Sequence, residues 1–247
     1  MLSFFRKHLF LADYLEGLVD IHNHVLPGID DGAKSLEVSQ QMITLYKDLG
    51  YSGVIATPHV MEDFYHNTQA TIQTAFDELK TVRPQHDNYP FHASAEYMLD
   101  AQFDKLLANK ELTPLYEDML LVEMSFFKPP MDLEQKLFDI RRHDYMGIMA
   151  HPERYTYLKD KSAFENIKKR GCFFQLNLLS LSGHYGKDVF KKAELLLREE
   201  MIDFVGTDAH KPEHLKKIQQ IQIPRSVEKQ LIEVIESTKE TFIAPQG

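Results

Sequence analysis

The sequence predicts an α/β fold whose parallel sheet closes into a (β/α) barrel, and three observations support this prediction. Short apolar runs alternate with polar segments of helical character along the chain. The runs are mostly apolar at successive positions, as in strands that helices cover on both faces. A length of 247 residues is typical of an α/β barrel that folds as one domain. An open doubly wound sheet is the alternative that the same pattern permits.

Seven short runs rich in Val, Ile, Leu, Phe and Met are the predicted strands. They span 18–22, 53–57, 91–97, 119–124, 145–151, 172–177 and 202–207. Segments of helical character follow them. The predicted helices lie near 34–49, 68–83, 100–109, 132–143, 162–170, 187–199 and 225–238. Because a parallel strand pair needs a crossover connection, this alternation indicates βαβ units, and seven of them favour a barrel over an open sheet.

The first residues, MLSFFRKHLFLADYLEG, read as an N-terminal helical extension over 1–17 that precedes a single domain over 18–247. Arg6, Lys7 and His8 interrupt its apolar patch, so it lacks the apolar core of a signal peptide. We expect this extension to pack against the domain; contact with a membrane or a partner is the alternative. No apolar run approaches the ~18 residues that a membrane-spanning helix needs.

Composition excludes several classes of protein. Lys and Arg number 28 against 37 Asp and Glu, a net charge of −9, which argues against a nucleic-acid scaffold. Cys172 is the one cysteine, so disulfide frameworks and thiolate zinc sites are excluded and a reducing compartment, the cytoplasm, is expected. Thiol phosphatases need an Arg six residues after the nucleophilic Cys. Leu178 occupies that position, so this class is rejected.

Polar side chains stand where the predicted strands end, the edge at which parallel α/β folds gather their chemistry. Taken singly, each has a structural explanation: a turn, a loop histidine or a salt bridge. Glu123 is harder to explain in this way, because a carboxylate inside the apolar run LLVEM is costly to bury unless it is paired or bound to metal. Together with Asp31, the candidates are His22, His24, His59, Glu96, Glu123, His151, Asp208 and His210.

These residue types in this number predict a metal centre. His, Asp and Glu without Cys form a ligand set for zinc, manganese or iron. His22 and His24 alternate on one strand and therefore face the same way. Nine candidates exceed the three or four ligands of one ion, so more than one ion is expected. Clustered divalent ions support the hydrolysis of phosphate esters.

The fuller motifs HNHVLPGIDDGAKS, VIATPHVMEDFYHNT, AHPERY and GTDAH resemble the polymerase-and-histidinol-phosphatase (PHP) superfamily. Within it, they are similar to the bacterial protein-tyrosine phosphatases that accompany capsule and exopolysaccharide synthesis. The resemblance covers roughly residues 18–215, with the motifs in the expected order. It implies a distorted (β/α)7 barrel and a trinuclear site, usually of manganese, with iron or zinc as alternatives.

The resemblance also implies which residues hold each ion. It places His22, His24, Glu96 and Asp208 on the first ion and Asp31, His59 and His210 on the second. Glu123 and His151 go to the third, with Glu96 bridging from the first. Arg154 is expected to bind the phosphate, since a guanidinium can bond it bidentately; the alternative is a surface salt bridge. We predict catalytic roles for Arg154, His59, His210 and Asp208.

One departure from the family concerns a second phosphate-binding arginine expected a few residues after the DAH motif. Leu215 stands about there, and Lys211, Lys216 or Lys217 is a candidate replacement. The segment LLSLSGHYGKD resembles a rim loop of the family, in which Tyr185 either packs on an aromatic substrate or is a packed rim aromatic.

The expected function is hydrolysis of phosphotyrosine, on the tail of a bacterial tyrosine autokinase that regulates polysaccharide synthesis or export. The enzyme is expected in the cytoplasm, with membrane association only through a partner. The first alternative is a PHP phosphoesterase that acts on a small metabolite such as histidinol phosphate. The second is a catalytically silent regulatory module, against which the full ligand set argues. The sequence predicts no nucleic-acid partner and leaves the oligomeric state open.

Overall fold

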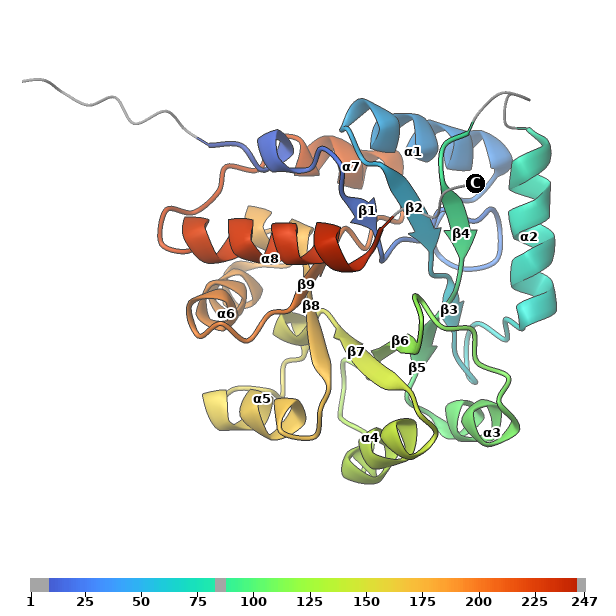
Figure 1. The fold of residues 1–247 in the computed structure, drawn as a ribbon, viewed down its shortest axis with the longest axis vertical. Coiled ribbons are helices and arrows are strands. Elements are labelled where there is room, and N and C mark those ends of the chain that lie inside the picture. The colour runs from blue at the N-terminus through green and yellow to red at the C-terminus, as the bar shows by residue number, and fades with distance from the viewer. Residues whose placement is uncertain (1–8, 83–87, 244–247) are drawn as a thin grey trace, which may run out of the picture.

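The computed structural model describes residues 9–82 and 88–243 of the chain. All its paired strands run parallel and form two sheets in the middle of the molecule (Figure 1). The first sheet has the strand order β1 (Val19–Asp20), β2 (Gly53–Ala56), β4 (Phe91–Ala93). The second has the order β3 (His59–Val60), β5 (Glu96–Met98), β6 (Met119–Glu123), β7 (Met146–Ala150), β8 (Phe173–Asn177), β9 (Phe204–Gly206). Each predicted strand segment contains at least one of these strands.

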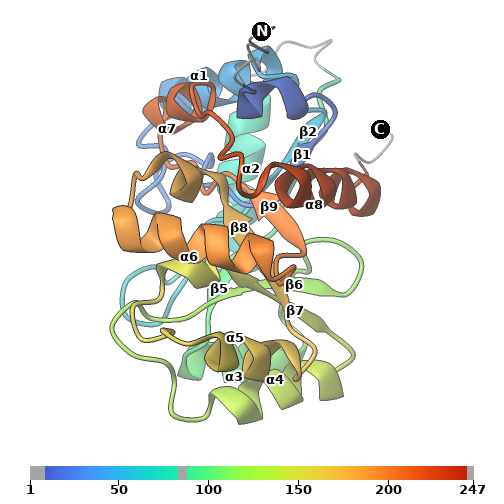
Figure 2. The same cartoon turned by 90° about the vertical axis from the view of Figure 1, so that its left-hand side faces the viewer.

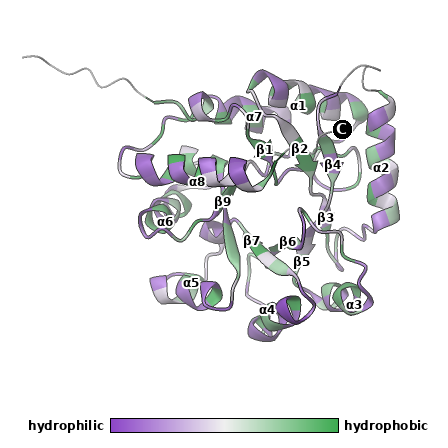
Figure 3. Ribbon diagram, viewed as in Figure 1, coloured by the Kyte–Doolittle hydropathy of each residue, from purple (hydrophilic) through white to green (hydrophobic). Residues whose placement is uncertain are grey.

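Helices lie around the strands, and Figure 2 shows α1 and α7 side by side at one end of the molecule. The α-helices are α1 (Leu36–Asp48), α2 (Gln69–Thr81), α3 (Ala101–Asn109), α4 (Leu133–Arg142), α5 (Lys161–Lys168), α6 (Lys187–Arg198), α7 (Pro212–Ile218) and α8 (Glu228–Thr241). In Figure 3, α2 and α8 carry hydrophilic residues interspersed with hydrophobic ones, as expected of helices with one face on a sheet and one in water. None of the helices in the described ranges is long and apolar enough to span a bilayer.

Helix α7 was not predicted from the sequence. It begins at Pro212. Proline is well suited to the first turn of a helix, because the backbone N–H that it lacks would have no partner within the helix at that position. Leu215 and Ile218, three residues apart, bury the inner face. Part of the predicted N-terminal extension, residues 1–8, lies outside the described residues. The rest contains the 3-10 helix η1 (Leu11–Tyr14), and the backbone N–H of Leu11 donates to the carbonyl oxygen of Ile221 at 2.8 Å.

The first sheet continues into the second, because two neighbouring extended segments are each interrupted by two residues and then resume as strands of the second sheet. Thr57 and Pro58 separate β2 from β3, and Ser94 and Ala95 separate β4 from β5. Pro58 has no N–H to donate to a neighbouring strand. The paired chains stay joined across the break, since Ser94 N donates to Ala56 O at 2.8 Å and Glu96 N to Pro58 O at 3.0 Å. His59 and Glu96 therefore begin β3 and β5 directly opposite each other.

The sheets also meet where the chain leaves β1 and β9. Asn23 forms a parallel bridge with Ala209. The backbone N–H of Asp208 donates to His22 O at 2.7 Å, and that of His24 donates to Ala209 O at 3.0 Å. These contacts place the residues that follow β1 beside those that follow β9.

Apolar side chains form two clusters on opposite sides of the strands. On β6, Leu121 belongs to a cluster with side chains from β1, β2, β7 and β9, while its neighbours Leu120 and Val122 face the larger cluster beneath the helices. Phe242, just after α8, contributes to the smaller cluster. Strands that are apolar on both faces were the basis of the parallel-sheet prediction, and this packing confirms it.

Candidate metal centre

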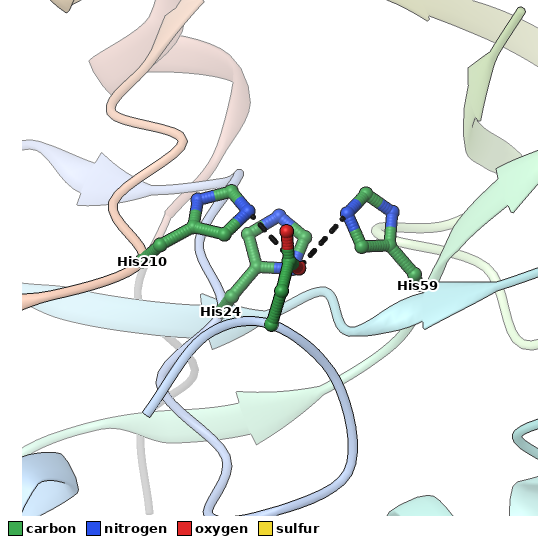
Figure 4. Close-up of side chains that lie close together, drawn as sticks. His24, His59 and His210 are labelled. Carbon is green, nitrogen blue, oxygen red and sulfur yellow. Dashed lines mark ion pairs between the residues drawn. The ribbon is translucent and has the colours of Figure 1, made fainter. Parts of the chain in front are cut away.

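All nine predicted ligands meet at one end of the strands. Their nitrogen and oxygen atoms form four overlapping groups in which the atoms lie within 4.8 Å of one another. The groups are His22–His24–Asp208, His22–Glu96–His151, His59–Glu96–Glu123 and His24–Asp31–His59–His210. Figure 4 shows His24, His59 and His210 turned toward a common space. Because the groups share members, one connected centre is formed rather than separate sites.

His22 and His24 follow β1 and point to the same side, as their spacing predicted. Their Nε2 atoms lie 3.3 and 3.2 Å from the Oδ1 atom of Asp208. The Oε2 atom of Glu96 lies 3.2 Å from His22 Nε2 and 3.5 Å from His24 Nε2. All four side chains are almost fully buried.

The turn after His24 brings Asp31 back to the centre. Gly28, at φ 72°, reverses the chain, and the Ala33 N–H donates to His24 O at 3.0 Å. Asp31 Oδ1 then lies 3.5 Å from His59 Nε2 and 3.4 Å from His210 Nε2. A Cβ on Gly32 would lie 2.1 Å from the His24 carbonyl oxygen, so only glycine lets this turn pack so closely.

Glu123 and His151 complete the centre on its third side. Glu123 Oε1 lies 2.9 Å from His59 Nδ1, and His151 Nε2 lies 3.1 Å from Glu96 Oε1. Glu123 is therefore nearest to His59, and His151 groups with His22 and Glu96. The resemblance places Glu123 and His151 on the same ion, so the distribution of ligands among the ions stays a prediction.

Several buried polar atoms of the centre make no well-aligned hydrogen bond among the described residues, although most of them lie within 3.5 Å of another such atom. They are His22 Nε2, His24 Nε2, His59 Nδ1, His151 Nδ1, Glu96 Oε2 and Glu123 Oε1. Buried polar atoms without partners are costly. A mixed imidazole and carboxylate set is what zinc, manganese and iron accept. The residues present therefore fit a centre of divalent ions.

Two residues outside the predicted set orient the ligands. Gln175, in β8, places its Oε1 2.7 Å from His22 Nδ1, and Asp30 places its Oδ2 2.8 Å from His24 Nδ1. Such partners fix the ring and direct the other nitrogen toward the metal. Asp30 also accepts from the backbone N–H groups of His59 and Gly32. Sequence reasoning assigned Asp30 only to the turn and missed Gln175, whose one signal is an amide inside the apolar run FFQLN.

The charges of the centre favour bound cations. Burial raises the pKa of the Glu96 and Asp208 carboxyls, but the surrounding histidines, His22 first, bring both pKa values well below the usual range. Burial lowers the pKa of His24, but its neighbour Asp30 and further carboxylates raise it well above the ordinary value. Without metal the carboxylates therefore favour the protonated forms of His22, His24 and His59, whose pKa values are raised, but not of His151, whose pKa burial lowers to about 4. Those protons occupy the nitrogen atoms that an ion would use.

Two of the predicted ligands adopt a left-handed backbone conformation that residues other than glycine rarely take. His151 has φ 38° and Asp208 has φ 49°; both are buried, His151 directly after β7 and Asp208 two residues after β9. Such a conformation costs of order 1 kcal/mol or more and persists where the surroundings enforce it. It turns each side chain sharply out of the strand direction and into the centre.

Arg154 lies at the edge of the centre and is no surface salt bridge. Its Nη1 donates to Asp208 Oδ2 at 2.6 Å, and the side chain is only 20% exposed. Asn177 Nδ2 donates to the same oxygen at 2.8 Å, which leaves Asp208 Oδ1 to the histidines. Asn177 was not predicted as a site residue.

A cleft of about 600 Å³ opens beside Arg154. It is also lined by Asp31, Asp208, His210, Tyr185, Lys34 and Lys211. Leu215 is fully buried in α7 and does not line it. Of the lysines considered as replacements for the expected arginine, Lys211 lines this cleft, whereas Lys217 Nζ lies 3.0 Å from His184 Nδ1.

Glu153, between His151 and Arg154, is a fully buried carboxyl that the sequence did not single out. It accepts hydrogen bonds from the Asn177 backbone N–H at 3.0 Å and from Ser180 Oγ at 2.7 Å. Burial raises its pKa to about 7. These bonds attach the 3-10 helix η2 (Pro152–Arg154) to the 3-10 helix η3 (Leu178–Ser182), so Arg154 and the loop that bears Tyr185 are held together.

Known proteins are similar to this chain in sequence and in fold. The chain is 30% identical over 197 residues to the tyrosine-protein phosphatase YwqE of Bacillus subtilis, covering 78% of this chain and 77% of that protein. It is 26% identical to the tyrosine-protein phosphatase CpsB of Streptococcus pneumoniae, covering 78% and 83%.

Among solved structures, one described for YwqE and CpsB as metal-dependent tyrosine phosphatases matches with a TM-score of 0.74 and 25% identity. The match covers 93% of this chain and 97% of that one. The family model for capsular polysaccharide synthesis, CpsB/CapC, matches residues 18–237. The chain therefore belongs to the CpsB/CapC family of capsular polysaccharide synthesis.

Proposed function

We propose that this chain is a metal-dependent protein-tyrosine phosphatase that hydrolyses phosphotyrosine. The observation that carries the proposal is the group of buried nitrogen and oxygen atoms that lie close together without well-aligned hydrogen bonds, beside Arg154 and an open cleft. The names of its relatives, tyrosine-protein phosphatases, support the same activity.

The proposed centre holds three divalent ions, manganese in the first place, with iron or zinc as alternatives. The ligands are the nine residues predicted from the sequence, and the four overlapping groups they form support more than one ion. When bound, such ions supply an activated water and neutralise phosphoryl oxygens. Gln175 and Asp30 keep the rings of His22 and His24 turned toward the ions.

The chain's own side chains bind the phosphate and assist the leaving group. Arg154 offers N–H groups to the phosphoryl oxygens from the wall of the cleft. The leaving tyrosinate oxygen needs a proton or a nearby positive charge. His210 lines the cleft, and the His59 ring lies 6.0 Å from the His210 ring, so these two histidines are the candidates for that role. Asp208 accepts a hydrogen bond from the Arg154 guanidinium through Oδ2, and its Oδ1 faces His22 and His24.

We further propose that the two sheets are the halves of one distorted (β/α)7 barrel that spans residues 18–247, with residues 1–17 as an extension. Three features support this architecture. The interrupted strands join the sheets on one side, and the contacts between Asn23 and Ala209 join them on the other. The smaller apolar cluster contains side chains from strands of both sheets.

The proposed substrate is a phosphotyrosine on a bacterial tyrosine autokinase that controls polysaccharide synthesis, dephosphorylated in the cytoplasm. An open cleft suits a flexible tail, and membership of a capsular polysaccharide synthesis family supports the process.

Assays of the purified, Mn²⁺-loaded protein on a phosphotyrosine peptide and on histidinol phosphate test this function. We expect the peptide to be hydrolysed with the higher kcat/KM. A preference for histidinol phosphate by orders of magnitude would assign the chain to the metabolite phosphoesterases. Turnover of neither substrate, together with failure of the purified protein to retain Mn²⁺, would identify a silent module.

The role of Arg154 is tested by Arg154→Ala. A charge-assisted hydrogen bond contributes about 1.5–3 kcal/mol, so we expect kcat/KM to fall roughly 10- to 100-fold. Metal content should stay intact, because Asn177 still donates to Asp208. The matched control is Arg142→Ala on the exposed face of α4. Kinetics equal to those of the unmodified protein would remove Arg154 from the mechanism.

A further inference from the structure

The guanidinium of Arg154 lies between two aromatic rings. Its Cζ atom is 4.6 Å from the centroid of the Phe126 ring and 4.3 Å from that of Tyr185. Both distances are within the range of favourable cation–π contacts. Phe126 follows β6, Tyr185 follows η3 and Arg154 follows β7, so three separate loops meet at this contact.

Each ring is itself held in place. The Phe126 ring stacks on the His151 ring at 5.5 Å with an angle of 28°. The Tyr185 hydroxyl lies 3.1 Å from Asn177 Nδ2, the amide that also donates to Asp208. Tyr185 is therefore a packed aromatic of the rim, and the face it offers is already covered by Arg154.

We propose that Phe126 and Tyr185 are positioning residues that fix the orientation of Arg154 for the phosphate. This inference rests on the proposed function, in which Arg154 binds phosphoryl oxygens. An arginine side chain has several rotatable bonds, and ordering it during binding weakens affinity. The two rings and Asp208 order it in advance. Within the described ranges, the bond to Asp208 is the one hydrogen bond of the guanidinium, so its other N–H groups remain for a ligand in the cleft.

The orientation of Arg154 matters more here because the cleft has no second arginine among its described lining residues. The lysines that line it are Lys34 and Lys211, and both side chains are exposed. A lysine acts as a point charge, whereas a fixed guanidinium can bond two phosphoryl oxygens at once. The rings therefore support the one group of the cleft that recognises phosphate by shape.

Binding of inorganic phosphate to the Mn²⁺-loaded protein, measured by calorimetry, tests the inference. Tyr185→Leu removes the ring, whereas Tyr185→Phe keeps it and removes only the hydroxyl. From the usual strength of cation–π contacts, we expect about 3- to 30-fold weaker binding for Tyr185→Leu. We expect Tyr185→Phe to bind within about twofold of the unmodified protein. Phe126→Leu should behave like Tyr185→Leu, with metal content measured in parallel because Phe126 touches His151.

Phe127→Leu is the matched control, since Phe127 is adjacent to Phe126 but 94% exposed; it should bind phosphate like the unmodified protein. In an Arg154→Ala background, Tyr185→Leu should cause no further loss, because the ring acts through the arginine. Unchanged binding in Tyr185→Leu and Phe126→Leu would overturn the inference. So would an equal loss in Tyr185→Phe, or a full additional loss in the Arg154→Ala background.

Turnover separates this inference from the proposed function. If Arg154 acts on the phosphate, Tyr185→Leu lowers kcat/KM equally for a phosphotyrosine peptide and for an aliphatic phosphate monoester. A loss confined to the aromatic substrate would show that Tyr185 contacts the phenyl ring, against the inference. If the unmodified protein hydrolyses no phosphotyrosine but the phosphate-binding pattern holds, the proposed reaction fails and the positioning role stands.

Discussion

Asp31 differs from the other predicted ligands because half of its side chain is exposed. Removing it deletes little packing, so we expect Asp31→Ala to change the free energy of unfolding of the metal-free protein by no more than about 0.5 kcal/mol. Metal content and phosphotyrosine hydrolysis should both fall, since Asp31 Oδ1 faces both His59 and His210. Elemental analysis and a thermal melt measure the two effects.

The matched control for Asp31 is Asp63→Ala, an exposed aspartate of the loop that follows β3. It should leave metal content and activity unchanged. If Asp31→Ala keeps its full metal content and its activity, the segment 30–32 is only a turn and Asp31 is not a ligand.

Cys172 provides a test of the reaction class at a single residue. Its thiol is almost fully buried, and burial raises its pKa to about 12. We expect the native protein to react with a thiol reagent at least about a hundredfold more slowly than the unfolded protein. Cys172→Ala should keep its phosphotyrosine activity. Loss of turnover in a folded, metal-loaded Cys172→Ala protein would contradict a mechanism without a thiol nucleophile.

Residues of the centre were predictable to different degrees. Most of the nine predicted ligands could be found because they are polar residues at or near the end of an apolar run, Glu123 because it lies inside one, and Asp31 through the family motif. Gln175 could not, because its contact with His22 joins residues 153 positions apart. The packing of Arg154 between Phe126 and Tyr185 could not be predicted either, because the two rings come from separate loops that only the fold brings together.

At the scale of elements, a buried carboxylate joins β1 to α1 and to the end of β9. Asp20 accepts hydrogen bonds from the Tyr46 hydroxyl at 2.6 Å and from the Thr207 hydroxyl at 2.7 Å. The Thr207 backbone N–H donates to its other oxygen at 2.9 Å. These bonds lie two residues before His22 and one before Asp208, so they support the segments that carry both ligands.

Substitutions in this network measure how strongly it joins the elements. Tyr46→Phe removes the hydroxyl that bonds both Asp20 and the Thr207 hydroxyl, and should lower the free energy of unfolding by about 1–3 kcal/mol. Asp20→Ala leaves several buried donors unsatisfied and should cost roughly 2–4 kcal/mol. Chemical denaturation measures both. Thr44→Ala, on the exposed side of α1, should stay within about 0.5 kcal/mol. Equal effects of Asp20→Ala and Thr44→Ala would show that the network joins nothing.

The elements themselves were largely predictable. The alternation of apolar runs and helical segments predicted each α-helix except α7 and the position of each strand except β3, with β4 and β5 predicted as one strand. Helix α7 was missed because its seven residues are too few for a periodic pattern. The interruption at Ser94–Ala95 was missed because the predicted run 91–97 continues across it, and β3 was missed because the predicted run 53–57 ends before Pro58. The family resemblance predicted from the motifs is confirmed by the family model, and the distorted barrel stays a proposal.

For the whole molecule, the charges of the centre make stability depend on pH and metal together. Burial lowers the pKa of His24 and of His59, but neighbouring carboxylates, Asp30 and Glu123 first, raise both well above the ordinary value. The folded, metal-free protein thus keeps protons that the unfolded chain releases. This stabilisation is complete below the unfolded pKa of about 6.5 and is lost as the pH rises through the folded pKa.

We therefore expect the melting temperature of the chelated protein to fall as the pH rises above about 6.5. Mn²⁺ should restore it, most strongly at the higher pH values, because ions bind the nitrogen atoms that the protons have left. Thermal melts over a series of pH values, with chelator and with Mn²⁺, measure the effect. A melting temperature of the chelated protein that rises with pH would contradict this assignment of charges.

The central claim is that phosphotyrosine hydrolysis depends on a centre of more than one metal ion. The direct measurement strips the protein with chelator, adds Mn²⁺ in steps, and records bound metal and turnover of a phosphotyrosine peptide on the same samples. We predict no turnover in the stripped protein and full recovery only when more than one ion is bound per chain. Undiminished turnover by a protein that elemental analysis shows to be free of metal would contradict the claim.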